Sequence, residues 1–264
     1  MIQMRDATRR VLWTLVLAAA LAAPSARSGD LLQEGAGAAA VSGSDWSCVA
    51  ELQSALAALD AGDAEGALNH YRAALGTATS DSLRFQALLG LGSTYAALRQ
   101  ADKAMPALER ARDLAPDNAE VWYVLGTVYK EAGQSENALQ AFGVAARLEP
   151  GLAAAHADRC LLLSELGRYR EATAACQSAL EADPSHAPAW IGLGVASYQL
   201  GAFEDAAAAF REALRAQPGS GRARYGLGLS LLFVGDREGA VAQYVQLKEL
   251  DPALAQDLYR RVFP

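Results

Sequence analysis

Apolar residues recur at helical spacing along most of the chain, in short stretches separated by turns. In one such stretch Trp122, Leu125 and Tyr129 lie on one face of a helix. Gly133 then interrupts the pattern, and a second stretch with its own apolar face stops before Pro150. Proline cannot continue a helix and disfavours helical angles in the residue before it. The pattern therefore predicts a unit of two amphipathic helices joined by a turn.

This unit is repeated at a fixed interval of 34 residues. Prolines follow the interval at Pro116, Pro150, Pro184, Pro218 and Pro252. Alanines follow it at Ala104, Ala138, Ala172, Ala206 and Ala240. Glycines follow it at Gly92, Gly126, Gly194 and Gly228, and Cys160 stands in the place of the missing glycine. Such self-similarity predicts a chain built from stacked copies of one unit.

The composition agrees with a helical chain. The sequence has 264 residues, of which 52% are apolar and 7% are aromatic. Its β-branched residues are scattered and do not form alternating runs, so helices should dominate. We predict an all-α fold with a chain long enough to bury a substantial core.

The unit resembles the tetratricopeptide repeat, whose signature is Trp-x-x-Leu-Gly-x-x-Tyr followed by Ala-x-x-x-Phe and Pro. The matching residues in the copy that begins at Ala119 are Trp122, Leu125, Gly126, Tyr129, Ala138, Phe142 and Pro150. The resemblance implies a right-handed superhelical α-solenoid of helix-turn-helix repeats. It also implies that the first helix of each repeat lines the concave side of the stack.

The spacing predicts six repeats, covering residues 48–84, 85–118, 119–152, 153–186, 187–220 and 221–254. Residues 255–264 are expected to form a C-terminal capping helix. The first repeat lacks the early part of the signature, which is common for terminal repeats. The fourth repeat carries His156, Arg159 and Cys160 where a large apolar residue, Leu and Gly are expected. Its first helix is therefore expected to pack less regularly.

The N-terminus has the features of a targeting segment. A basic stretch precedes an apolar run at residues 11–23, and Ala20 and Ala22 supply a small-x-small cleavage pattern. We predict a signal peptide at residues 1–22; the alternative, an uncleaved anchor, requires a longer run. Residues 23–47 are rich in Gly, Ala and Ser and are expected to form a flexible leader. The mature protein is therefore predicted to be exported, periplasmic or secreted, with no membrane span.

The charge of the chain argues against nucleic acid as a partner. The full sequence has a net charge of −7, and removal of residues 1–22 takes away three arginines and one aspartate, leaving about −9. Neutralisation of phosphates by Lys and Arg supplies most of the affinity for nucleic acid. An acidic chain without a basic stripe is a poor candidate for that role.

The first helices carry a second stripe beside their core residues, and this stripe is expected to face the concave groove. We predict partner-binding residues at Leu89, Tyr123, Thr127, Lys130, Leu161, Ile191, Val195, Tyr198, Tyr225 and Leu229. Apart from Lys130 these residues are apolar, small or hydroxylic, which favours a protein partner offering an apolar segment or an amphipathic helix. The alternative is that neighbouring helices bury the stripe, or that the chain's own leader or end helix covers it.

The cysteines are Cys48, Cys160 and Cys176. In an exported protein a disulfide between Cys160 and Cys176 would staple the two helices of the fourth repeat. Counting back from the turn at Gly167 places Cys160 opposite Ala172, so the bridge requires a diagonal reach. The alternative is that both thiols fill the packing positions that Gly and Phe occupy in other repeats.

No residues point to catalysis, a cofactor or a metal. His70, His156 and His186 lie in different repeats without Cys, Asp or Glu at ligand spacing. Phosphate-binding loops, nucleophile elbows and paired carboxylates on an apolar face are absent from the sequence. We therefore expect a non-enzymatic protein.

Two functions remain open at this point. The first is a protein–protein interaction scaffold or adaptor that binds a partner segment in its groove, within a cell-envelope assembly; the envelope setting comes from common uses of the fold. The second is a carbohydrate or cell-wall binding module, or an accessory subunit of an enzyme complex, with Tyr123, Tyr198 and Tyr225 stacking on sugar rings.

Overall fold

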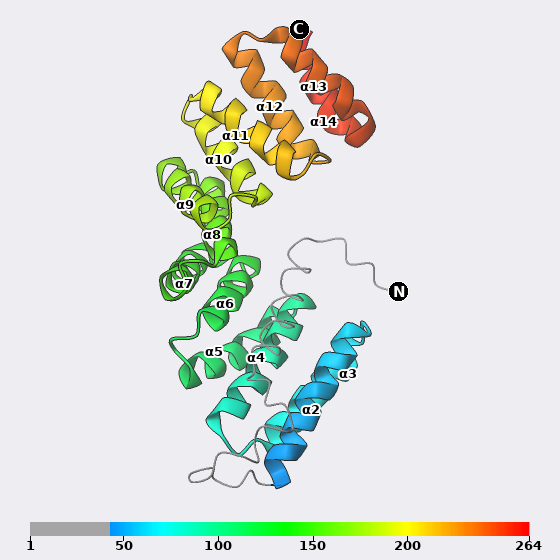
Figure 1. Cartoon of the computed structure of the whole chain (residues 1–264), viewed down its shortest axis with the longest axis vertical. Coiled ribbons are helices and arrows are strands. Elements are labelled where there is room, and N and C mark those ends of the chain that lie inside the picture. Colours follow the sequence, from blue (N-terminus) through cyan, green and yellow to red (C-terminus); the bar gives the residue numbers. More distant parts are fainter. Residues whose placement is uncertain (1–42, 264) are drawn as a thin grey trace, which may run out of the picture. The chain divides into compact units, whose positions relative to one another are not determined.

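A computed structural model describes residues 43–263. The predicted signal peptide and most of the predicted leader lie outside this range. Over residues 43–263 the chain forms thirteen helices and no strand (Figure 1). The helices are α2 (Gly43–Asp60), α3 (Ala64–Thr77), α4 (Asp81–Ala97), α5 (Ala101–Leu114), α6 (Ala119–Glu131), α7 (Ser135–Leu148), α8 (Ala153–Glu165), α9 (Tyr169–Ala182), α10 (Ala187–Gln199), α11 (Phe203–Ala216), α12 (Gly221–Val234), α13 (Arg237–Leu250) and α14 (Pro252–Val262). The even-numbered helices up to α12 are the first helices of the repeats, and the odd-numbered helices are the second.

The ends of the helices follow from local sequence signals. In the second to sixth repeats the second helix (α5, α7, α9, α11 or α13) ends two residues before a repeated proline. For example, α7 ends at Leu148 before Pro150. Side chains cap the starts of several first helices: the Asn118 side chain accepts a hydrogen bond from the backbone N–H of Val121 at 3.1 Å. These local signals explain why the helix boundaries repeat with the sequence.

Both ends of the helical region differ from the sequence-based boundaries. α2 begins at Gly43, so residues 43–47 of the predicted leader belong to its first turn. Asp45 in that turn accepts a hydrogen bond from the Thr79 hydroxyl, which ties the start of α2 to the loop after α3. At the other end α14 begins at Pro252 and not at residue 255, because the Asp251 side chain caps it and proline is favourable in the first turn.

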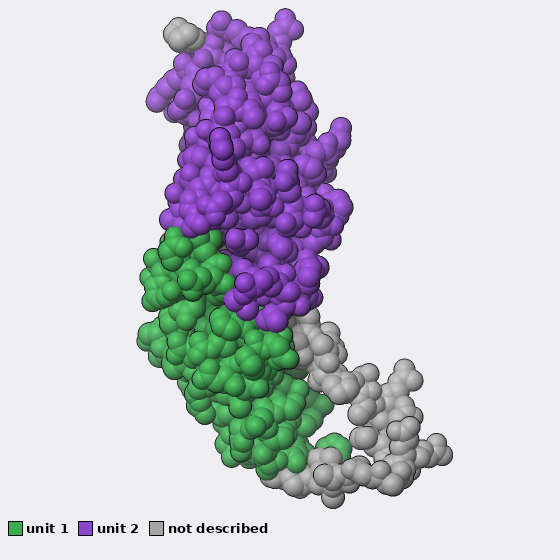
Figure 2. Space-filling view, turned by 90° about the vertical axis from the view of Figure 1, so that its left-hand side faces the viewer, with its two compact units in different colours: residues 1–141 green, residues 142–264 purple. Residues whose placement is uncertain are grey.

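The chain divides into two compact units, residues 1–141 and residues 142–264 (Figure 2). Within the first unit each helix from α2 to α6 packs on the next one, and the first helices α2, α4 and α6 also contact one another in order. Within the second unit the same holds from α8 to α14, with contacts between α8 and α10, α10 and α12, and α12 and α14. Each unit is therefore a stack of helix pairs with its first helices side by side.

The turn inside each repeat depends on a residue in the left-handed region. Gly62, Gly133, Gly167, Gly201 and Gly235 have positive φ angles there. These residues allow the backbone N–H groups just after the helix to bond back to its last carbonyls, as Gln134 N does to Tyr129 O at 2.8 Å. The second repeat has Arg99 at this position, with φ 58°, although side chains with a Cβ disfavour this conformation. Arg99 is thus a strained point in an otherwise glycine-based turn.

Replacing Arg99 by Gly should relieve this strain. We expect Arg99→Gly to be more stable to urea unfolding than Arg99→Ala by about 1 kcal/mol, because both variants lose the arginine side chain but only glycine tolerates a positive φ. Equal stability of the two variants would contradict this explanation.

Candidate partner-binding surface

The predicted stripe is largely buried in the first unit. Leu89 on α4 and Tyr123 and Thr127 on α6 are buried, and Tyr123 is only 2% exposed. Lys130, at the end of the same stripe on α6, is partly exposed. Because α4 contacts α2, α3, α5 and α6, little of its surface is left open. These three buried residues are therefore not accessible to a partner in this structure, contrary to the expectation of an open groove.

In the second unit the same stripe is more open. Leu161 on α8, Val195 on α10 and Leu229 on α12 are half-buried. Val195 and Leu229 pack at the margin of a core whose centre includes Phe210, Leu227 and Leu258, and Ile191 is buried within this core. Since α8, α10 and α12 lie side by side, their half-buried residues form one surface. We call this surface the first-helix face.

An aromatic cluster lies where the stripe reaches the end of α10. The ring of Tyr198 meets the rings of Phe203 and Phe233 edge-on, at centroid distances of 5.4 and 5.5 Å. Phe203 and Phe233 stack on each other at 4.4 Å. Phe233 is 60% exposed, a large value for an aromatic side chain. We call Tyr198, Phe203 and Phe233 the aromatic edge.

Phe203 and Phe233 lie outside the stripe of predicted groove residues and were not among the predicted binding residues. At the ends of the first helices three apolar residues, Leu166, Leu200 and Val234, are also exposed and lie 34 residues apart. These positions are expected to face water, so apolar residues repeated there are a sequence signal. They could have predicted an apolar edge along the turns.

Tyr225 is held by the chain's own end helix. Its hydroxyl donates a hydrogen bond to the Asp257 carboxylate on α14, and Arg261 Nε donates to the same carboxylate oxygen at 2.8 Å. Burial and this hydrogen bond raise the pKa of Tyr225 to about 12. The hydrogen bonds from Tyr225 and Arg261 lower the pKa of Asp257. Tyr225 therefore anchors α14, as one of the sequence-based alternatives allowed.

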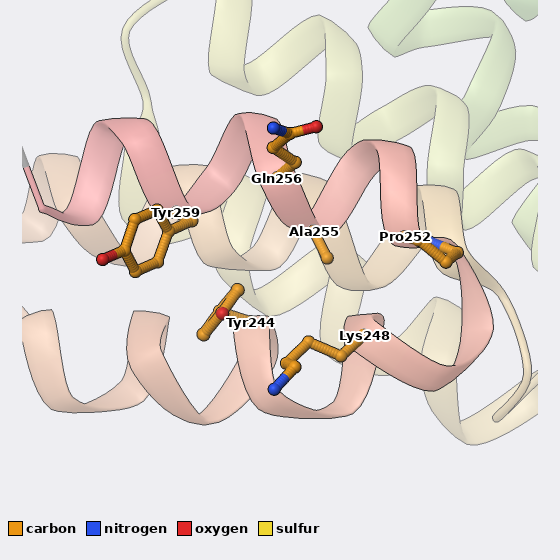
Figure 3. A pocket seen from close by; sticks show the side chains of 6 residues that line it. All are labelled: Tyr244, Lys248, Pro252, Ala255, Gln256 and Tyr259. Atoms are coloured by element: carbon orange, nitrogen blue, oxygen red, sulfur yellow. The ribbon is translucent and has the colours of Figure 1, made fainter.

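A separate hollow of about 320 Å³ lies between α13 and α14 (Figure 3). Its lining residues are Tyr244, Lys248, Pro252, Ala255, Gln256 and Tyr259. Over residues 43–263 no group of three His, Cys, Asp or Glu side chains is placed to hold a metal. In the same range no helix has the length and apolar character needed to span a bilayer.

Comparison with known proteins agrees with this architecture. Sequence models of the tetratricopeptide repeat match residues 85–128, 119–151 and 158–221. The chain belongs to the tetratricopeptide repeat proteins. No curated relative matches the chain in sequence.

Several solved tetratricopeptide repeat structures share the fold. PilF of Pseudomonas aeruginosa superposes with a TM-score of 0.73 at 19% identity, over 83% of this chain and all of that chain. PilW, described as a type IV pilus biogenesis factor, gives 0.69 at 19% identity, over 80% of this chain and 97% of that one. YrrB, described as having an unusual peptide-binding site, gives 0.56 at 26% identity, over 67% and 89%. The family and these structures suggest a scaffold for protein–protein interactions.

The fourth tetratricopeptide repeat contains a covalent link. Cys160 on α8 and Cys176 on α9 are bonded through their sulfurs, with their Cα atoms 5.2 Å apart. Counting residues along the helices suggested a longer, diagonal reach. Ala157 and Ala172, about one helical turn before the two cysteines, are small and also buried. Gly192 on α10 leaves room for it, since a Cβ there would lie 2.7 Å from the Cys160 sulfur.

The cysteines occupy the positions of a recurring contact. In the fifth repeat Gly194 takes the place of Cys160 and Phe210 takes the place of Cys176, and a Cβ on Gly194 would lie 2.8 Å from the Phe210 ring. The disulfide thus replaces a glycine–phenylalanine contact between the two helices of a repeat.

Reduction of this disulfide should destabilise the protein. The bridge joins residues 16 positions apart, and closing a loop of this length stabilises a fold by about 3 kcal/mol in the chain-entropy model. We expect the urea midpoint to fall when a reductant is added, whereas the midpoint of the variant Cys160→Gly with Cys176→Phe should not respond. If the natural protein were equally stable with and without reductant, the bridge would not contribute to stability.

Proposed function

We propose that the protein is a non-catalytic adaptor that holds an apolar segment of a partner protein on the first-helix face and aromatic edge of its second unit. The exposed aromatic edge carries this proposal. Aromatic side chains that stay exposed beside a half-buried apolar surface typically mark a protein interaction site. The half-buried residues Leu161, Val195 and Leu229 extend the surface across three helices and suit an amphipathic helix or an extended apolar segment.

Two further observations support an exported adaptor. A buried disulfide between Cys160 and Cys176 is typical of oxidising compartments such as the periplasm. PilW shares the fold and is described as a type IV pilus biogenesis factor, and YrrB is described as having an unusual peptide-binding site. On this basis we propose a role within a cell-envelope assembly, in which the protein positions a partner and performs no chemistry on it.

The structure gives less support to the carbohydrate-binding alternative. That hypothesis needs a row of accessible tyrosine rings. Tyr123, however, is buried, and the Tyr225 hydroxyl is hydrogen-bonded to Asp257. Tyr198 remains partly accessible, but its ring already packs against Phe203 and Phe233. One partly accessible tyrosine ring is a weaker basis for sugar stacking than the apolar surface is for a protein partner.

Substitution of Phe233 tests the adaptor hypothesis directly. A photoreactive amino acid at position 233 should cross-link a partner protein in envelope extract, and Phe233→Asp should weaken retention of that partner by at least about tenfold, as for a buried aromatic anchor. Trp46→Asp is a matched control, because Trp46 is 59% exposed but lies on α2 in the other unit. The hypothesis fails if Trp46→Asp removes the partner and Phe233→Asp does not, or if glycan strands are retained in place of protein.

Export has its own test. If residues 1–22 are a signal peptide, mass spectrometry of the protein isolated from cells should show a mature chain that begins at residue 23. An intact N-terminus on protein recovered from the cytoplasm would contradict the exported part of the proposal and leave the binding surface untouched.

A further inference from the structure

The bond between Cys160 and Cys176 lies beneath the next helix of the stack. Both cysteines are 0% exposed, so neither sulfur reaches the surface. The first helix of the fifth repeat, α10, contacts both α8 and α9, the helices that carry the two cysteines (Figure 1). A Cβ on Gly192 of α10 would lie 2.7 Å from the sulfur of Cys160 and 2.9 Å from that of Cys176. The backbone of α10 therefore packs directly against both sulfurs.

The contact around the bond is also buried. Ala157 on α8, Ala179 on α9 and Ala189 on α10 form one buried cluster, and none of the three is more than 2% exposed. Each of these alanines lies three residues along its helix from a cysteine or from Gly192. The cover over the bond therefore extends about one helical turn beyond the sulfurs.

Formation of the bond needs an access that the folded chain does not offer. In thiol–disulfide exchange a cysteine thiolate attacks an external disulfide, forms a mixed disulfide and releases one external thiol. The thiolate of the second cysteine then attacks the sulfur of the first, which closes the Cys160–Cys176 bond and releases the second external thiol. The external disulfide takes up the two electrons, and the two protons of the cysteine thiols end on the released thiols. An external sulfur must therefore touch a cysteine that α10 covers.

We propose that the Cys160–Cys176 bond forms while α8 and α9 are an open hairpin, before α10 packs, and that α10 then closes the bond to further exchange. The two helices follow each other in the chain and are joined by the Gly167 turn, so they can pair before the fifth repeat is added. The bond is then a permanent staple and not a redox switch, because a reductant meets the same closed contact. The proposal does not depend on what the first-helix face binds.

The third thiol is withdrawn from exchange inside the first repeat. Cys48 on α2 is 0% exposed, and its thiol donates a hydrogen bond to the carbonyl oxygen of Ala74 on α3 at 3.3 Å. Burial raises the pKa of Cys48, which lowers the fraction of reactive thiolate. The first repeat precedes the fourth in the chain. Once it has folded, Cys160 and Cys176 are the cysteines that remain to react with each other.

The rate of reduction tests whether the packed chain covers the bond. Reduction is the reverse of bond formation and needs the same access to a sulfur. Dithiothreitol should reduce the bond at least about a hundredfold more slowly in the folded chain than in the chain unfolded in urea, because only opened molecules react. Alkylation of the released thiols with a maleimide polymer counts them on a gel. Equal rates in the folded and unfolded chain would overturn the proposal.

A matched pair of alanine variants tests whether the cover is α10. Gly192→Ala adds a Cβ for which the two sulfurs leave no room, so α10 should pack less closely and reduction should become at least about tenfold faster. Gly143→Ala, also inside a helix, should leave the rate unchanged, since its Cβ would meet nothing closer than 3.9 Å. Circular dichroism checks that both variants keep their helices. If Gly192→Ala is reduced no faster than Gly143→Ala, α10 is not the cover.

Pulsed oxidation tests the order of events. Reduced and unfolded Cys48→Ala chains, in which one pair of cysteines remains, are refolded with oxidised glutathione added at the start or after circular dichroism shows native helix content. We expect late addition to close the bond at least about tenfold more slowly, because α10 has already packed. A reduced chain that gains no native helix until the bond closes also supports this order. Equally fast closure in the folded and unfolded reduced chain would overturn it.

Discussion

The close approach of the two helices within a repeat is the constraint on which the rest of this structure depends. A small residue on the first helix faces a large residue on the second, as Gly194 faces Phe210, and the contact leaves no space for even a Cβ. Close packing of this kind makes each pair a rigid unit whose remaining surfaces are set by its neighbours. In the fourth repeat Cys160 and Cys176 occupy the same two positions and hold the pair covalently.

This packing determines which surface remains for binding. The first helices lie side by side in both units, but in the first unit the stripe residues Tyr123 and Thr127 are core. In the second unit the stripe stays half open and continues onto Phe233 at the turn edge. The two units therefore share one repeat sequence pattern but differ in what they expose.

The end of the stack combines a polar attachment with an apolar surface. The hydrogen bond from Tyr225 to Asp257 joins α12 to α14, and Arg261 on α14 donates to the same carboxylate. Ala255 and Leu258 pack into the core, while Tyr259 and Phe263, the residue that follows the helix, stay partly exposed.

The sequence by itself determined the features that depend on neighbouring residues along the chain. The repeated prolines mark where second helices end, as at Leu148 before Pro150, and the turn glycines mark where first helices end. The helical class and the two-helix unit follow from the same local physics, because capping, proline and left-handed turns act within a few residues.

The tertiary structure decided what depends on the distances and angles between helices. The burial of Tyr123, the bond from Tyr225 to Asp257 and the stacking of Phe203 on Phe233 join residues whose side chains meet only after the helices have packed. The 5.2 Å separation of Cys160 and Cys176 likewise depends on how α8 and α9 cross. A repeat period gives the order of helices but not these crossing geometries, because small changes in packing decide whether a side chain becomes core, surface or interface.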